Sequence, residues 1–125
     1  MARRDLTGAV DFAYLETYAA DDQAVVDEVL GLFREQATLW MRLLDPSAPG
    51  QAWRDAAHTL KGSALGVGAT ALAEACAAAE QAAQMSSVER TYRLERVRNA
   101  LEAVLADIAA YAHEQALKSL RSPSA

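Results

Sequence analysis

The run LERVRNALEAVLADIAAY, residues 94–111, is the strongest indication of the fold in this sequence. Its large apolar residues return at alternating steps of three and four, which places them along one face of an α-helix. A face of this kind is typical of a helix that packs lengthwise against neighbouring helices in a bundle. The apolar seam consists of Leu94, Val97, Leu101, Val104, Ile108 and Tyr111.

The helix that carries this seam has a recognisable start. Ser86 and Glu89 have the spacing of a capping box, in which the serine side chain accepts a hydrogen bond from the backbone three residues later. We therefore expect the helix to begin at this point and to reach Leu120.

Four further helical segments precede this helix, and loop signals separate them. Pro46 and Pro49 lie in the clearest loop of the chain, and Gly66-Val67-Gly68 is a natural helix stop. The sequence therefore predicts an all-α fold, an antiparallel four-helix bundle with a short additional N-terminal helix. The preceding helices are expected over residues 11–19, from a cap at Asp21 or Asp22 to Leu44, over residues 51–65 and over residues 70–85.

Helical spacing also predicts which side chains of these segments face the core. The second segment is expected to bury Val26, Val29, Phe33, Trp40 and Leu43. The third is expected to bury Trp53, Ala56, Ala57, Leu60 and Ala64, and the fourth Leu72, Cys76, Ala79 and Ala83.

The length of 125 residues favours a single domain. We divide the chain into an N-terminal extension over residues 1–10, the bundle over residues 11–120 and a flexible tail over residues 121–125. Apolar residues make up 52% of the chain and 29 residues are alanine, so the core is expected to consist of closely packed small side chains.

Composition and charge argue against several classes of function. The net charge of −5 disfavours general nucleic-acid binding, which needs a basic surface. The single cysteine, Cys76, excludes an intramolecular disulfide and a cysteine-rich zinc site. No stretch approaches the roughly 20 apolar residues of a membrane helix. We expect a cytoplasmic protein with no membrane association.

The third helical segment holds the informative polar residues. His58 lies about 145° from the centre of the predicted buried stripe, so it should face solvent. Its neighbours on that face are Arg54, Lys61, Gly62 and Leu65, at spacings of three, four and seven residues.

Gly62 is unusual, because glycine inside a helix costs about 1 kcal/mol relative to alanine. A bare backbone one turn from His58 clears space beside the imidazole. Arg54 and Lys61 add positive charge nearby. An exposed nucleophilic nitrogen, adjacent cations and a clear approach suit a site that accepts a phosphoryl group.

The run from Ala57 to Ala64, AHTLKGSA, followed by Val67-Gly68-Ala69, closely resembles the signature of histidine-containing phosphotransfer (HPt) domains. These domains are four-helix bundles of two-component phosphorelays. The close match covers about residues 53–83. The resemblance implies that His58 accepts the phosphoryl group, that Lys61 stabilises its charge and that Gly62 lets a receiver domain dock.

The resemblance also implies a role for Glu80, which follows His58 by 22 residues. A carboxylate at this position could accept a hydrogen bond from one ring nitrogen and make the other nitrogen the nucleophile. Simple antiparallel symmetry about Val67 places Cys76 opposite His58, so the Glu80 assignment rests on the resemblance. Leu65 departs from the family pattern, where this position is often small, and we expect it to shape the choice of partner.

The expected function is that of a phosphorelay intermediate. Such a protein would shuttle a phosphoryl group between response-regulator receiver domains, downstream of a hybrid histidine kinase. It would act as a monomer without autokinase activity. It would hold no cofactor and no metal, since the Mg²⁺ would belong to the receiver.

Three alternatives remain to be weighed. A sensor-kinase dimerisation module also uses a helical histidine, but Thr59-Leu60-Lys61-Gly62 lacks the proline of that class and the class requires a dimer. A helical adaptor could dock receiver domains without phosphotransfer. A metal-carboxylate enzyme would need a Glu-x-x-His pair, which the sequence lacks. The second histidine, His113, is expected to be solvated and Cys76 to be a core residue.

Overall fold

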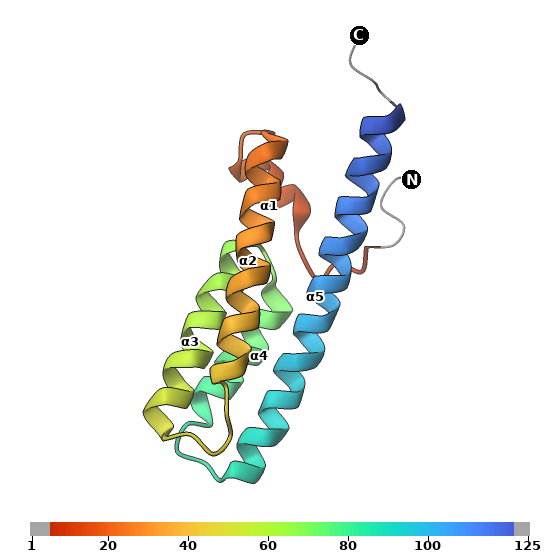
Figure 1. Cartoon of the computed structure of the whole chain (residues 1–125). Helices are drawn as coiled ribbons and strands as arrows, with labels where there is room; N and C mark the ends of the chain where they lie inside the picture. Colours follow the sequence, from red (N-terminus) through yellow and green to blue (C-terminus); the bar gives the residue numbers. More distant parts are fainter. Residues whose placement is uncertain (1–5, 122–125) are drawn as a thin grey trace.

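The computed structural model describes residues 6–121, and these residues form helices but no strands. Figure 1 shows four longer helices side by side in a bundle, with a short helix at one end. The predicted all-α four-helix bundle is confirmed. The helices are α1 (Phe12–Tyr18), α2 (Gln23–Leu43), α3 (Gly50–Gly66), α4 (Thr70–Gln81) and α5 (Ser87–Arg121).

The helix ends follow the predicted signals closely. Asp22 caps α2, since its side chain accepts a hydrogen bond of 3.1 Å from the backbone N–H of Ala24. Ser86 precedes α5 and its hydroxyl accepts a bond of 3.2 Å from the N–H of Glu89. The capping residues named from the sequence therefore set the starts of both helices.

The end of α3 is a Schellman motif. The N–H of Ala69 donates to the carbonyl of Ala64 at 2.8 Å, and the N–H of Gly68 donates to the carbonyl of Leu65 at 3.1 Å. Gly68 has φ of +75°, which glycine adopts without a steric penalty. The predicted helix stop is therefore confirmed, and it turns the chain directly into α4.

The end of α4 was predicted too late. The helix ends at Gln81 and not at residue 85. Its last turn tightens, since Ala82 donates its N–H to the carbonyl of Ala79 at 3.0 Å. The sequence around residues 82–85 contains no proline or glycine, so nothing local marks this end.

Most of the predicted core is confirmed. All residues of the α5 seam, of the α3 stripe and of the α4 stripe are buried. The prediction was wrong for Leu43, which is 47% exposed, and Val29 and Trp40 are only partly buried. Helix α2 carries two adjacent apolar stripes, and the pattern alone mixed them. The stripe that faces the core consists of Val26, Leu30, Phe33 and Ala37, followed by Leu44.

The segment before α1 is fastened to α5. Asp107 is fully buried, and its carboxylate accepts hydrogen bonds from the backbone N–H groups of Thr7 and Ala9, each at 2.9 Å. The Thr7 hydroxyl donates a third bond at 3.0 Å. Val10 is also buried in the core. Residues 1–5 of the predicted extension and residues 122–125 of the predicted tail lie outside the described residues, whereas Arg121 belongs to α5.

Gly50, the first residue of α3, permits a close approach of the loop after α4. A Cβ atom at this position would lie 2.7 Å from the backbone oxygen of Ala83 and 3.0 Å from the side-chain nitrogen of Gln84. Backbone cannot yield as a flexible side chain can, so the contact fixes glycine here.

Replacement of Gly50 by alanine is therefore expected to lower the free energy of unfolding by about 1–3 kcal/mol, through the forced contact with Ala83. Gly31→Ala is the matched control, because a Cβ atom at Gly31 in α2 meets nothing within 4 Å. This variant should gain about 0.5–1 kcal/mol from helix propensity. Urea denaturation followed by circular dichroism measures both, and equal stabilities of the two variants would contradict the prediction.

Candidate functional site

His58 lies on the outer face of α3, as the helical spacing predicts. Its side chain is 65% exposed, while Ala57 and Leu60 beside it are fully buried. The buried stripe fixes the rotation of α3 about its axis, and this rotation presents the imidazole to solvent.

The carboxylate of Glu80 in α4 joins two side chains of α3. Its Oε2 atom lies 3.0 Å from Nδ1 of His58, and its Oε1 atom accepts a hydrogen bond of 2.9 Å from Nζ of Lys61. The structure thus brings together His58, Lys61 and Glu80. The symmetry argument about Val67 had placed Cys76 opposite His58, but Cys76 is fully buried and the contact with His58 comes from Glu80, one turn further along.

The charge of Glu80 determines the tautomer of His58. The hydrogen bond from Lys61, followed by that from His58, holds the pKa of the Glu80 carboxyl below its ordinary value. An ionised carboxylate only accepts hydrogen bonds, so Nδ1 of His58 must carry the proton that it shares with Glu80. The lone pair of the neutral ring therefore lies on Nε2.

The remaining predicted residues surround this trio on the same face. Arg54 and Lys61 line a shallow hollow of about 380 Å³ between α3 and α4, together with Glu80. Gly62 is exposed, and a Cβ atom there would meet nothing within 4 Å. Leu65 is 53% exposed. Two cations, open space and one apolar side chain thus surround the imidazole.

Helix α2 lies beside α3 at Ser63, next to Gly62, and its exposed leucines were not predicted from the sequence. The Ser63 hydroxyl lies 3.4 Å from Oε1 of Gln36, which places Gln36 beside α3. Leu32 and Leu39, one turn on either side of Gln36, are 53% and 51% exposed. The signal that could have found them is the second apolar stripe of α2, which the pattern analysis merged with the first.

The other candidate groups named from the sequence, Cys76 and His113, are not part of the trio of His58, Lys61 and Glu80. Cys76 is fully buried, and burial raises the pKa of its thiol to about 12, so it stays protonated. His113 is exposed on α5. In the described part of the chain, no cluster of three or more His, Cys, Asp or Glu side chains is placed to hold a metal ion.

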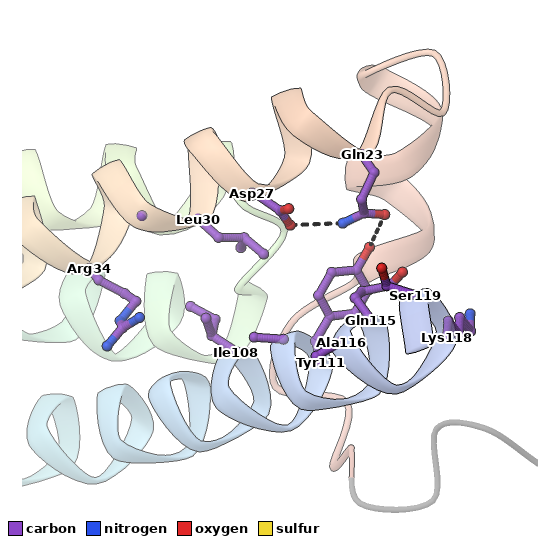
Figure 2. Close-up of a pocket in the computed structure, with 12 residues that line it drawn as sticks. Gln23, Asp27, Leu30, Arg34, Ile108, Tyr111, Gln115, Ala116, Lys118 and Ser119 are labelled. Atoms are coloured by element: carbon purple, nitrogen blue, oxygen red, sulfur yellow. Dashed lines mark hydrogen bonds between the residues drawn. The ribbon is translucent and has the colours of Figure 1, made fainter. Parts of the chain in front are cut away.

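A larger hollow of about 770 Å³ lies between α2 and α5 and is lined by none of the predicted site residues. Figure 2 shows three of its polar side chains joined in a chain, in which Gln23 donates to Asp27 at 2.8 Å and accepts from the Tyr111 hydroxyl at 3.2 Å. Tyr111 also stacks on Phe12 at 4.3 Å. The polar groups at this end of the hollow bond to one another and join α2 to α5.

None of the helices described over residues 6–121 has the apolar length that crossing a bilayer requires.

The helical bundle and its solvent-facing histidine define a class of small helical phosphotransfer proteins. The chain belongs to the Hpt domain family, whose model matches residues 14–113. It is similar to a solved structure of the histidine phosphotransferase ShpA from Caulobacter crescentus, with 63% sequence identity and a TM-score of 0.74. That similarity covers 90% of this chain and 99% of the other. The comparison with curated proteins finds no match.

The family predicted from the motif around His58 is thereby confirmed. So is the function that this family performs, phosphotransfer in two-component signalling. Hpt proteins interact with histidine kinases and response regulators, and they serve as intermediates of phosphorelays.

Removal of the Lys61 ammonium is expected to raise the pKa of Glu80 towards its ordinary value, since the Lys61 hydrogen bond is the largest cause of the lowering. Carboxyl ¹³C NMR titration of Lys61→Met against wild type measures the change. Lys118→Met, which removes an exposed lysine of α5, is the matched control and should leave Glu80 unchanged.

The ion pair of Lys61 and Glu80 also predicts that the free energy of unfolding depends on pH. A lowered carboxyl pKa stabilises the fold above the unfolded-state pKa, and the contribution is lost as the pH falls through the folded-state pKa. The pair is partly exposed, so its loss in Lys61→Met should cost about 0.5 kcal/mol near neutral pH. The difference between wild type and variant should vanish in acid. A difference that stays constant through the acid range would contradict the assignment.

Proposed function

We propose that His58 is the residue that carries the phosphoryl group. The observation that carries this proposal is the trio of His58, Glu80 and Lys61, in which a solvent-facing imidazole has its Nδ1 proton held by a carboxylate. The nucleophilic nitrogen, Nε2, is the one left with the lone pair. A cation and an exposed glycine lie within one turn of it.

The transfer step follows from this geometry. A receiver domain that bears a phospho-aspartate docks on the face around His58, and Nε2 attacks phosphorus in line. The bond from phosphorus to Nε2 forms while the bond to the aspartyl oxygen breaks, and the electron pair of the broken bond stays on the aspartate. The ring becomes positively charged, and the Glu80 carboxylate stabilises that charge.

Lys61 and Arg54 would stabilise the phosphoryl oxygens. The Lys61 ammonium has three N–H donors and uses one for Glu80, so two others are available to a phosphoryl group. A second receiver reverses the same step and removes the group. The chain itself would supply positioning and charge, while the Mg²⁺ would be bound by the receiver and no cofactor by this chain.

We place the protein as a monomer between a hybrid histidine kinase and response-regulator receivers, without autokinase activity. Support for docking at this face comes from the exposed Leu65 one turn from the open backbone of Gly62, and from the exposed Leu32 and Leu39 on α2, which contacts α3 at Ser63. Apolar side chains exposed together around a polar centre are typical of protein-binding surfaces.

The acceptor assignment is tested by incubation with phosphorylated receiver domains. Wild type should take the label in a bond that is labile in acid and stable in alkali, and His58→Gln should take none. His113→Gln is the matched control, since His113 is the other histidine of the chain, and it should behave as wild type.

Label that persists on His58→Gln would overturn the assignment and point to His113. Absence of label on wild type from every receiver that binds it would favour the alternative function, a helical adaptor that docks receivers without phosphotransfer. A binding assay with the same receivers identifies which of them dock.

Gly62 provides a separate test of docking. Gly62→Ala should stabilise the fold by about 1 kcal/mol, because α3 gains helix propensity and the new methyl group meets no other atom. Gly62→Gln should retain the fold but slow transfer at least about tenfold, as its side chain occupies the space through which a receiver approaches. Equal transfer rates for Gly62→Gln and wild type would show that the receiver does not use this space.

A further inference from the structure

The carbonyl groups at the end of α4 are held by side chains from two other helices. Trp53 of α3 donates its indole N–H to the carbonyl of Ala79 at 2.6 Å. Arg93 of α5 donates to the carbonyl of Ala78 at 2.7 Å, and Arg90 donates to that of Ala83 at 2.5 Å. The last carbonyls of a helix have few partners within the helix. The carbonyl of Ala79 also accepts the N–H of Ala82 at 3.0 Å in the tightened last turn, so the side-chain donors add to this local cap and tie it to α3 and α5.

Glu80 lies in the sequence between the residues whose carbonyls accept these bonds, Ala78 and Ala79 before it and Ala83 after it. It follows Ala79 directly, and its carboxylate reaches back across the α3–α4 interface to His58 and Lys61. The last turn of a helix frays unless it is held. The position of the Glu80 carboxylate therefore depends on what holds the backbone of Ala79.

Small side chains form the packing at the end of α4. The buried residues at the end of α4 and just beyond it are Ala79, Ala82 and Ala83, whose methyl groups interlock little with a neighbouring helix. Trp53, in contrast, is the largest fully buried side chain among residues 6–121, and its hydrogen bond is directional. This bond is a directional link between α3 and α4 next to Glu80.

We propose that Trp53 is a positioning residue of the phosphotransfer site. By holding the Ala79 carbonyl, it places Glu80 where the carboxylate accepts the Nδ1 proton of His58 and leaves Nε2 as the nucleophile. The inference rests on the proposed role of His58 in phosphotransfer. The positioning of Glu80 can be measured separately, because it sets the tautomer of the His58 ring.

The test compares Trp53→Phe, which keeps an aromatic ring and loses the N–H donor, with wild type. Trp40→Phe is the matched control, because Trp40 is the other tryptophan and lies partly buried on α2. Glu80→Ala gives the reference for a ring without its carboxylate. The ¹⁵N NMR shifts of the His58 ring report the tautomer, and label transfer from a phosphorylated receiver reports the rate.

Trp53→Phe should move the His58 ring shifts from the wild-type values towards those of Glu80→Ala. It should also slow transfer about three- to tenfold, less than the hundredfold that a misplacement of a full ångström can cost. Trp40→Phe should change neither. Ring shifts in Trp53→Phe that equal those of wild type, or an equal change in Trp40→Phe, would overturn the proposal.

A second replacement covers the case in which Trp53→Phe does not fold. In the Trp40→Phe background, β-(3-benzothienyl)-alanine in place of tryptophan keeps the shape of the indole and replaces only its N–H by sulfur. The same displacement of the ring shifts is expected. If wild type takes no label at His58, the proposed function fails, whereas the tautomer shifts still decide whether Trp53 positions Glu80.

Discussion

Alanine occupies many of the buried positions on α3 and α4, including Ala56, Ala64, Ala73 and Ala79. Small side chains let two helices approach closely, and a close approach is what allows one carboxylate on α4 to contact two side chains on α3. A bulkier interface would hold the backbones further apart and leave Glu80 short of His58. The alanine residues at this interface are thus a condition for the contact between Glu80 and His58.

The helical repeat of apolar residues correctly predicted most of the side chains that face the core and those that face solvent. The α5 seam, the buried face of α3 and the exposure of His58 all follow from the helical repeat, and the structure agrees. It failed for Leu43, because α2 offers two apolar stripes one residue apart and only the packed structure selects between them. The end of α4 was missed because no proline or glycine marks it in the sequence, and the side chains that bond to its last carbonyls, Trp53 and Arg93, lie on other helices. The contact of Glu80 with His58 needed the family resemblance, because no local pattern encodes a pairing across two helices.

The thiol of Cys76 is a second nucleophilic group close to the proposed site, and it is buried. Cys76 lies in the helix that carries Glu80, and Lys61 and Glu80 both act on its thiol electrostatically. Burial dominates these influences and keeps the sulfur protonated. The thiol of Cys76 therefore does not compete with the imidazole of His58, the proposed acceptor of the phosphoryl group.

The buried carboxylate of Asp107 has a consequence for where the folded unit begins. The family match starts at residue 14, yet the groups that bond to Asp107 belong to Thr7 and Ala9. A chain cut at the family boundary would keep the carboxyl group of Asp107 buried in the core and remove all three of these donors, and a buried polar group without partners is costly to a small protein. The smallest stable unit is therefore longer than the segment that the family model matches, and any fusion or shortened version of this protein needs to retain the residues that precede α1.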